Sequence, residues 1–343
     1  MRTSRRLVFV GLVAAVVAAV TLGILVGTVP VDWGQAVLAM LQALPGLGGV
    51  GGPVDPAVRL IVVDLRLPRV LLGLFVGAAL GIGGAAMQAL LRNPLADPYI
   101  FGVSSGAAVG SALAIAGGFA LFGAMSFPAA AFVGAILATF LVYEVAKSSG
   151  RLPSETMLLA GLAIGSLLAA VASFIVFMDA RRHVNIIFWM LGSFDQASWD
   201  RVGAVALITI VAGILVLLHS RQLNAMLFGD ESAAHMGVEV ERVKVVVLFL
   251  VALLTAGAVA FAGIIGFVGV IVPHAMRLLV GPDNRYLVPA SALFGGALLV
   301  ACDLIARSVI PPTQVPVGIL TAFLGAPFFV YLLRRSRGLR SWA

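Results

Sequence analysis

Charged residues are scarce in this sequence, and cysteine is almost absent. Only 11% of the 343 residues are charged, against about 25% in a typical soluble protein. Hydrophobic residues make up 61%, and the mean hydropathy is +1.12. The single cysteine, Cys302, lies in an apolar run, which excludes a disulfide framework and a cysteine-based metal site. This composition predicts a protein that crosses a membrane many times.

Motifs for nucleotide and metal chemistry are also missing. No G-x-x-x-x-G-K-[ST] sequence occurs, so the chain has no P-loop for ATP. The G-x-G-x-x-A match at 81–86 lies inside an apolar segment with no preceding strand, which argues against a dinucleotide site. The histidines show no i, i+4 pair and no carboxylate at ligand spacing, so we expect no metal site at His183, His219, His235 or His274.

Acidic residues within the apolar segments are few. Glu144 and Asp303 lie close to predicted segment ends, where snorkelling or a local ion pair accounts for them. A proton-coupled secondary carrier usually needs an ionisable group in mid-membrane, so this scarcity counts against that class and leaves sodium coupling open. An intramembrane enzyme would need a catalytic dyad or a metal cluster, and the sequence offers neither.

The apolar segments predict ten membrane spans within a single transmembrane domain, 1–343. A span needs about 20 apolar residues. The first segment is longer than the apolar core of a secretory signal, so we expect it to be retained. The eighth is short and the fifth is followed by an amphiphilic stretch, so nine or eleven spans remain alternatives. The segments are 7–29, 69–91, 100–118, 126–146, 156–178, 202–219, 245–262, 265–280, 287–306 and 317–333.

The distribution of positive charge predicts the orientation. With the N-terminus in the cytoplasm and ten alternating spans, fifteen of the 22 lysines and arginines fall inside and seven outside. This bias follows the positive-inside rule and places both termini in the cytoplasm. The net charge of +7 therefore reports orientation and does not indicate a nucleic-acid partner.

Glycines recur at every fourth position in two neighbouring apolar segments. In a helix this spacing removes the side chains from one face and lets two backbones approach closely, as in small-xxx-small packing of membrane helices. We expect close helix packing along both stripes, which consist of Gly73, Gly77 and Gly81 in the first segment and Gly102, Gly106 and Gly110 in the second. A polar hinge, 92–98, joins them.

The only sizeable polar segment on the predicted cytoplasmic side is the loop at about 220–244. Asp230 is a good helix N-cap, Glu231 falls in the first turn, and Gly237 suits a C-cap. A second short helical piece, 238–243, is expected to lead into the seventh span. Two short capped helices would suit a partner protein, although a solvated connector is the alternative.

Seven cations on the predicted outer side need an explanation. Arg66 and Arg69 precede the second span and Arg307 ends the ninth, where they would bind acidic groups of an external partner or simply anchor helix ends. The pair Arg181 and Arg182, followed by His183, would face an anionic substrate or lie in a solvated loop.

Several long motifs together resemble a known family. They are LRLPR (65–69), GAALGIGGAAMQALLRNPLADP (77–98), GVSSGAAVG (102–110), GIIGFVGVIVPHAMRLLVGPDNR (263–285) and PVGILTAFLGAPFFVYLL (316–333). These stretches are similar to the FecCD-type permeases, the membrane subunits of ABC importers for ferric siderophores, haem and cobalamin. The resemblance runs in order from residue 57 to 335.

The resemblance implies the cobalamin/haem-importer permease fold, an all-α polytopic membrane protein of about ten helices in the bacterial inner membrane. The subunit would form a homodimer surrounded by membrane lipid, with two cytoplasmic ATPase subunits and a periplasmic substrate-binding protein. ATP and Mg²⁺ would bind to the ATPase subunits, and this chain would bind no cofactor. Nucleic acid has no place in such an assembly.

The resemblance also assigns roles to particular residues. The NPLA-type hinge forms the cytoplasmic gate in the family, which carries over to Asn93 and Leu95. The loop between the sixth and seventh spans receives the ATPase, which carries over to Ala233, Ala234 and Gly237. ATP would thus drive rigid-body shifts of the helices that open one side of the pathway at a time.

On the outer side, the resemblance implies that three arginines dock glutamates of the binding protein, namely Arg66, Arg69 and Arg307. The family commonly has an acidic residue where this chain has Gln314, which puts in doubt an ion pair there with Arg307 or a neighbour. For the substrate, haem or a ferric chelate is favoured over cobalamin, because the cluster at 181–183 would attract carboxylates.

Overall fold

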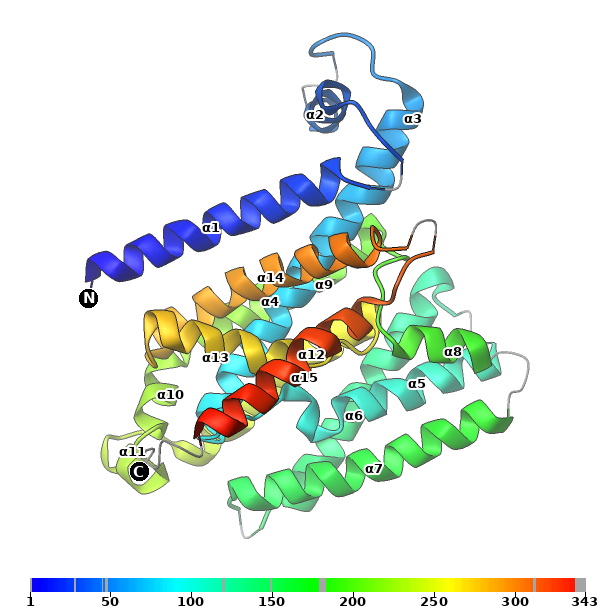
Figure 1. Ribbon diagram of the computed structural model, residues 1–343. Helices are drawn as coiled ribbons and strands as arrows, with labels where there is room; N and C mark the ends of the chain where they lie inside the picture. Colours follow the sequence, from blue (N-terminus) through cyan, green and yellow to red (C-terminus); the bar gives the residue numbers. More distant parts are fainter. Residues whose placement is uncertain are drawn as a thin grey trace.

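The computed structural model describes residues 2–27, 29–44, 46, 49–118, 121–148, 150–178, 183–310 and 313–336. Within these ranges the chain is helical and forms no β-strand; an isolated bridge joins Ser148 and Arg151. Figure 1 shows the helices as a bundle with one long helix, α4, through its centre. An all-helical bundle satisfies the backbone hydrogen bonds internally, as lipid requires.

Each of the ten predicted spans corresponds to one apolar helix, so that prediction is confirmed. Seven of these helices are long enough to cross a membrane and three are shorter, namely α5, α13 and the part of α15 up to Val330. The ten helices are α1 (Arg2–Leu25), α4 (Leu67–Leu90), α5 (Val103–Gly117), α6 (Ser126–Ala146), α7 (Ser154–Met178), α9 (Trp199–Leu218), α12 (Val240–Ala262), α13 (Val268–Val280), α14 (Asn284–Ala306) and α15 (Val317–Ser336).

Shorter helical elements connect the spans. They are α2 (Trp33–Gln42), α3 (Pro56–Arg59), η1 (Leu60–Arg66), η2 (Pro98–Phe101), η3 (Gly123–Met125), α8 (His183–Met190), α10 (Ser220–Met226) and α11 (Asp230–His235). The elements α3, η1 and α4 join into one helical run of 35 residues, Pro56–Leu90, in which η1 is a π-helical segment. The second span therefore begins well before the predicted residue 69.

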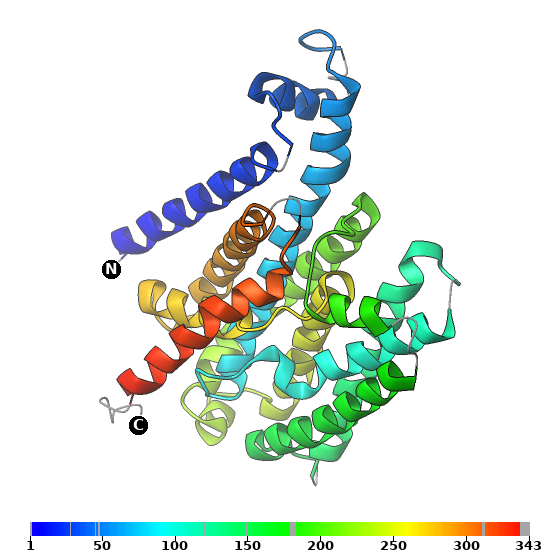
Figure 2. The same ribbon diagram turned by 45° about the vertical axis from the view of Figure 1, so that its right-hand side comes forward.

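The two ends of the bundle are distinct. The start of α1, the end of α15 and the helices α10 and α11 lie at one end, whereas α2 and α3 lie at the other (Figures 1 and 2). We refer to these as the α11 end and the α3 end. The connections between α5 and α6, α7 and α9, and α14 and α15 belong to the α3 end, because successive spans alternate in direction.

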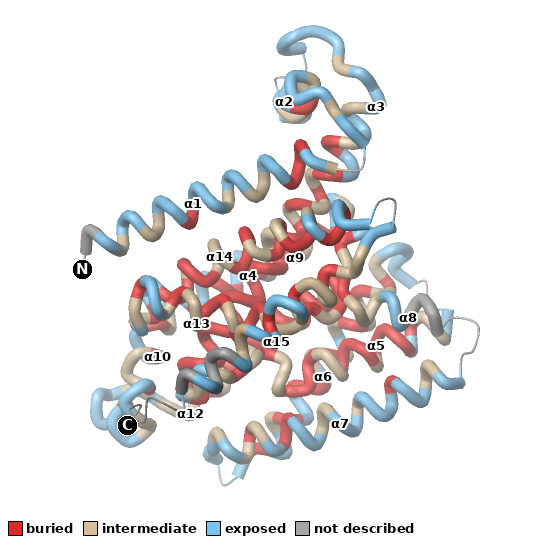
Figure 3. Tube along the Cα trace, in the orientation of Figure 1, coloured by how far each residue is buried: buried red, intermediate tan, exposed pale blue. Residues whose placement is uncertain are grey.

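Burial is greatest at the centre of the bundle and least on α1 and α7. The apolar part of the Pro56–Leu90 run is 78% buried, whereas only 17% of the corresponding windows of α1 and α7 are buried. Figure 3 shows this as a buried core around α4 with exposed outer helices. The exposed faces of α1 and α7 are rich in leucine, valine and phenylalanine, as expected for surfaces that contact lipid or another apolar surface.

The glycine stripe on α4 lies against α14. A Cβ atom at Gly77 would clash with the carbonyl of Gly295, and one at Gly81 with the carbonyl of Ser291. Gly73 differs, because a Cβ there would make ordinary contact with the Phe194 ring at 3.5 Å. At Gly77 and Gly81 the two helix backbones therefore touch directly, a geometry that only glycine permits.

The second stripe lies between α5 and α6. A Cβ at Gly106 would clash with the Gly134 carbonyl, and one at Gly110 with the Ala130 carbonyl. Gly102 does not belong to this helical face, because α5 begins one residue later and Gly102 adopts a left-handed conformation with φ 71°. It ends η2 instead, so its inclusion in the stripe is wrong.

Candidate functional site

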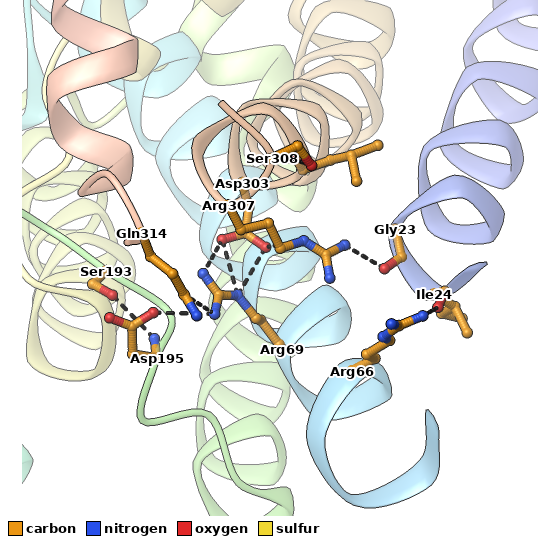
Figure 4. Close-up of polar contacts among 11 residues, drawn as sticks. Gly23, Ile24, Arg66, Arg69, Ser193, Asp195, Asp303, Arg307, Ser308 and Gln314 are labelled. Carbon is orange, nitrogen blue, oxygen red and sulfur yellow. Dashed lines mark hydrogen bonds and ion pairs between the residues drawn. The ribbon is translucent and has the colours of Figure 1, made fainter. Parts of the chain in front are cut away.

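A cluster of arginines joins α4 and α14 at the α3 end (Figure 4). Arg69 Nε lies 3.0 Å from both carboxylate oxygens of Asp303, and Nη2 lies 2.8 Å from Oδ1. The other terminal nitrogen, Nη1, lies 3.0 Å from Asp195 and donates to Gln314 Oε1 at 2.6 Å. Asp303 is 2% exposed, so this bidentate pair is shielded from water.

The other two arginines of the cluster bind the end of α1. Arg66 donates to the carbonyls of Ile24 and Leu25 at 2.9 and 3.1 Å and to that of Val29. Arg307 donates to the Gly23 carbonyl and lies 3.6 Å from Asp303. Helix C-termini leave carbonyls without intrahelical partners and attract cations, so both side chains cap α1.

All three predicted docking arginines are thus engaged within the chain. Arg66 and Arg307 are buried, and the side chain of Arg69 is 12% exposed. These contacts match the helix-end alternative that the sequence left open. Docking of a partner's glutamates stays a prediction, and it would require these internal bonds to rearrange.

Gln314 lies beside Arg69 and not beside Arg307. Its amide oxygen accepts a hydrogen bond from Arg69, while the carboxylate of Asp195 provides a second negative charge at the same guanidinium. The sequence singled out Gln314 but not Asp195, which follows the helix α8 in a turn, 193–197. Asp195 therefore supplies Arg69 with an acidic partner at the place where the family resemblance implied one.

At the α11 end, the hinge between α4 and α5 is organised by its own side chains. Asn93 Oδ1 accepts the Leu95 N–H at 2.9 Å, and Asp97 accepts the Tyr99 N–H at 2.8 Å. Arg92 adopts a left-handed conformation, φ 51°, which is unusual outside glycine. Asn93 shapes this turn, and its role as a gate with Leu95 stays a prediction.

The hinge also reaches the break between α12 and α13. The Tyr99 hydroxyl donates to the Ile265 carbonyl at 3.2 Å. A Cβ on Gly269, in the first turn of α13, would approach the Pro98 ring at 2.6 Å. The beginnings of the two short spans α5 and α13 therefore lie close together inside the bundle.

A network of charged side chains connects the hinge to α11. Asp230 lies 2.6 Å from Lys244 Nζ and 3.5 Å from Arg92 Nη2. Lys244 is 2% exposed and also contacts the Leu152 carbonyl at 3.0 Å and Glu241 at 3.3 Å. Glu241 in turn accepts the Leu152 N–H at 2.7 Å. One buried lysine thus ties together α11, α12 and the segment before α7.

The helix α11 itself differs from the prediction in detail. Gly229, with φ 105°, occupies the N-cap position, so Asp230 is the first helical residue and not the cap. Glu231 lies in the first turn as predicted. Gly237 adopts φ 82° and its N–H bonds to the Ala234 carbonyl, so it ends the helix as expected. Ala233 is buried, whereas Ala234 and Gly237 are exposed.

The predicted second short helix, 238–243, does not exist as a separate element. The seventh span starts at Val240 and continues to Ala262, so residues 240–243 form its first turn and 238–239 precede it. The helix that pairs with α11 is instead α10, which precedes it. We attribute the error to the polar residues Glu239, Glu241 and Arg242, which obscured the start of a long apolar helix.

The helix α10 is linked to the start of α14. Asn224 donates to Asp283 Oδ1 at 2.7 Å and accepts from the Asn284 backbone and side chain, both at 2.8 Å. Hydrogen bonds from the Arg285 side chain, and then from Asn224, lower the pKa of Asp283 to about 2. Asp283 is therefore ionised at neutral pH, and α10 and α11 are both attached to the span bundle by charged groups.

The predicted substrate cluster lies only partly within the described chain. Arg181 and Arg182 fall outside the described residues, and of His183 only the backbone, at the start of α8, is described. Further along α8, Phe188 and Trp189 line a cavity of 1030 Å³ at the α3 end.

The fold is that of a multi-pass α-helical membrane protein, with a cluster of charged side chains at each end of the bundle. Comparison with known proteins gives the family. Residues 8–335 match the FecCD transport family, and the chain belongs to that family.

Several relatives are named as permeases of import or transport systems. The chain is 47% identical to the cobalamin import system permease protein BtuC of Halobacterium salinarum, over 82% of this chain and 75% of that protein. It is 40% identical to the hemin transport system permease protein HmuU of Yersinia pestis, over 82% and 85%. It is 36% identical to the ferric enterobactin permease FepD of Escherichia coli, over 97% and 96%.

A solved structure shares the fold over almost the whole chain. It is a metal-chelate type ABC transporter in an inward-facing conformation, with a TM-score of 0.82 and 29% sequence identity. The match covers 96% of this chain and 99% of that one. The predicted fold class is therefore confirmed.

Proposed function

We propose that this chain is the transmembrane permease subunit of an ATP-driven ABC importer that moves haem or a ferric-siderophore chelate from the periplasm to the cytoplasm. Family membership and the relatives named as importer permeases support this function. Alternating access of the whole 1–343 domain would carry the substrate. The relative at 47% identity is a cobalamin permease, so cobalamin is the alternative substrate.

The proposed assembly contains two copies of this chain, two ATPase subunits and an external binding protein. ATP and Mg²⁺ bind to the ATPase subunits, because this sequence has no P-loop. We place the α11 end and both termini in the cytoplasm, since the positive charges concentrate on the loops of that side. The α3 end then faces the periplasm.

The observation that carries the mechanism is the ion network of Asp230. It joins α11, the proposed contact for the ATPase, to Arg92 in the proposed gate hinge and to buried Lys244. A shift of α11 would therefore displace the hinge and the base of α12 together. Packed helices move as rigid bodies between discrete arrangements, which the close contacts along Gly77 and Gly81 favour.

Reconstitution tests this function. The permease and its ATPase would be placed in liposomes with the binding protein added outside, and uptake of hemin, a ferric siderophore and cyanocobalamin would be measured with and without ATP enclosed. We expect ATP-dependent uptake of hemin or the siderophore. Uptake that ignores ATP and follows a sodium or proton gradient would instead establish a secondary carrier, and uptake of cyanocobalamin alone would establish the alternative substrate.

Labelling tests the gate. A cysteine introduced at Leu95, in a chain whose Cys302 is buried, would be probed with a membrane-impermeant thiol reagent from the cytoplasmic side. If Leu95 is part of the gate, its labelling rate should change when ATP is added. A labelling rate that does not change with ATP would indicate that the hinge only turns the chain and is not a gate.

A further inference from the structure

A cavity of 1030 Å³ opens among the connections at the α3 end. Its walls come from the start of α6, from α8, from the turn at 193–196, and from the first turn of α9. Small-molecule sites in proteins usually enclose about 300 to 1,000 Å³, so the cavity is large enough for a sizeable organic ligand.

Aromatic rings form much of the apolar wall. Phe127 and Trp189 meet edge to face, with ring centroids 5.3 Å apart and planes at 84°. Phe188 and Phe261 line the same cavity. Aromatic faces and edges pack favourably against other ring systems, so this wall suits a ligand with an extended planar ring.

One cation, Arg201, lines the cavity from the first turn of α9. Its residue is 8% exposed. Nη2 contacts Gln196 Oε1 at 3.0 Å and the Ala124 carbonyl at 3.5 Å. Among the described residues, Arg201 pairs with no carboxylate, and its Nε and Nη1 atoms have no hydrogen-bond partner. A guanidinium carries five N–H donors, so most of its donor capacity is unused.

The acidic residues near Arg201 are committed elsewhere. Asp195 lines the same cavity, but it is bound by Arg69 at 3.0 Å. Asp200, the chain neighbour of Arg201, is exposed and forms no ion pair with it. A buried charge without a counter-charge is unfavourable, and the N-terminus of α9 adds a further positive potential. An anionic group in the cavity would offset the charge of Arg201 and the positive potential of the α9 N-terminus.

We infer that this cavity binds an anionic aromatic chelate, with Arg201 as the group that binds a carboxylate or catecholate oxygen of the ligand. This inference rests on the proposed function and names where such a substrate is held at the α3 end. The aromatic wall packs against the ring system, and Gln196 orients the guanidinium through its hydrogen bond. Charge-assisted bonds from arginine to such oxygens are the strong ones, and they are geometrically specific.

Binding to the permease–ATPase complex in lipid nanodiscs tests the site without the binding protein. Hemin would be titrated while tryptophan fluorescence is recorded, with empty nanodiscs subtracted, because Trp189 forms part of the wall. The matched control ligand is hemin dimethyl ester, which keeps the ring and lacks free carboxylates. We expect the ester to bind about tenfold more weakly than hemin, the change expected from loss of one charge-assisted hydrogen bond.

Variants assign that difference to Arg201. Arg201→Gln should weaken hemin binding about tenfold and leave ester binding unchanged, whereas Arg201→Lys should give an intermediate loss. Arg59→Gln, which removes an exposed arginine at the same end, should change neither. If Arg201→Gln does not fold, the comparison of hemin with its ester on the unaltered chain still shows whether binding depends on the carboxylates.

Each outcome is informative. Binding of a ferric tricatecholate in place of hemin, with the same dependence on Arg201, supports the site and assigns the anion to a siderophore. Equal affinity for hemin and its ester, hemin binding that ignores Arg201→Gln, or binding of neutral cyanocobalamin alone overturns the site. The proposed function is tested separately. A complex that binds hemin through Arg201 but shows no ATP-driven uptake would support the site and contradict the importer function.

Discussion

The charged clusters at the two ends of the bundle use the same residue types in opposite ways. At the α3 end, Arg69 grips Asp303 with three contacts of 2.8 to 3.0 Å, and the Asp303 side chain is 3% exposed. At the α11 end, Arg92 and Asp230 lie 3.5 Å apart, with side chains 42% and 36% exposed. The first pair fastens α4 to α14, whereas the Arg92–Asp230 pair is longer and exposed to water.

This difference fits the division of labour expected in a membrane permease. A dry, bidentate ion pair resists separation, because each partner would be left as an uncompensated buried charge. A half-exposed pair exchanges its bonds for water at little cost. The helices should therefore move relative to one another at the α11 end, where α11 meets the hinge, and remain joined at the α3 end.

Breaking the tight cluster should have the largest effect. Asp303→Asn leaves Arg307 with no acidic partner among the described residues and removes the bidentate pair of Arg69. We expect a loss of about 3 to 5 kcal/mol in stability, measured as lower thermal stability of the purified protein in detergent. Asp200→Asn, at an exposed site, should change little. An unaltered melting temperature for Asp303→Asn would show that this ion pair does not stabilise the contact between α4 and α14.

Removing the buried Lys244 at the α11 end should have the next largest effect. Lys244→Met takes away the group that holds Asp230, Glu241 and the Leu152 carbonyl, at a cost of about 1 to 3 kcal/mol. ATP hydrolysis should continue while substrate uptake per ATP falls, because α11 is no longer attached to α12. Arg242→Met, at an exposed i, i+3 pair with Glu239, is the matched control. Equal uptake per ATP in both variants would contradict this role.

Adding a charge should sharpen the contrast by strengthening the tight end. Gln314→Glu would replace the neutral acceptor of Arg69 with a charged one, and charged hydrogen bonds are stronger by about 1 kcal/mol. The melting temperature should rise slightly in the unaltered background. In an Asp195→Asn background the gain should be larger, because the introduced carboxylate would then be the second acid at Arg69. A drop in stability in both backgrounds would oppose this interpretation.

The smallest change in stability should come from the loose pair. Arg92→Gln should cost less than about 1 kcal/mol, as for other exposed ion pairs. Its effect on uptake per ATP should nevertheless be measurable, if motion passes from α11 to the hinge through this contact. Raising the salt concentration should mimic the variant, since exposed charges are screened, and should leave the Asp303 cluster unaffected. Uptake that is insensitive to both would remove Arg92 from the transmission path.

The features that could be predicted from the sequence are those that depend on local composition. The ten spans follow from runs of apolar residues long enough to cross lipid, and the local ion pair proposed for Asp303 is present as its contact with Arg307, four residues on. The recurrence of glycine identified Gly77 and Gly81, where the backbone of α14 comes close. Each of these signals lies within one helix.

The sequence could not predict contacts between distant segments. Lys244 looked like one more cytoplasmic cation, because its Leu152 and Asp230 partners come from other elements. Arg201 was counted only as an outer charge, since the cavity that it lines is built from three connections far apart in the sequence. The assignment of Asp230 as N-cap failed because Gly229, with its positive φ, takes that position without a side chain.

The continuous run from Pro56 to Leu90 also sets where the membrane surface falls. Its 35 residues span about 52 Å at 1.5 Å per residue, whereas the hydrocarbon core is about 30 Å thick. The α4 portion alone, Leu67–Leu90, is long enough to fill that thickness, which puts Arg66 and Arg69 at the lipid boundary of the α3 end. The π-helical segment and α3 then rise about 15 Å above it, measured from Arg66 to Pro56. A protein approaching the α3 end meets this raised tip before it reaches the arginines at its base.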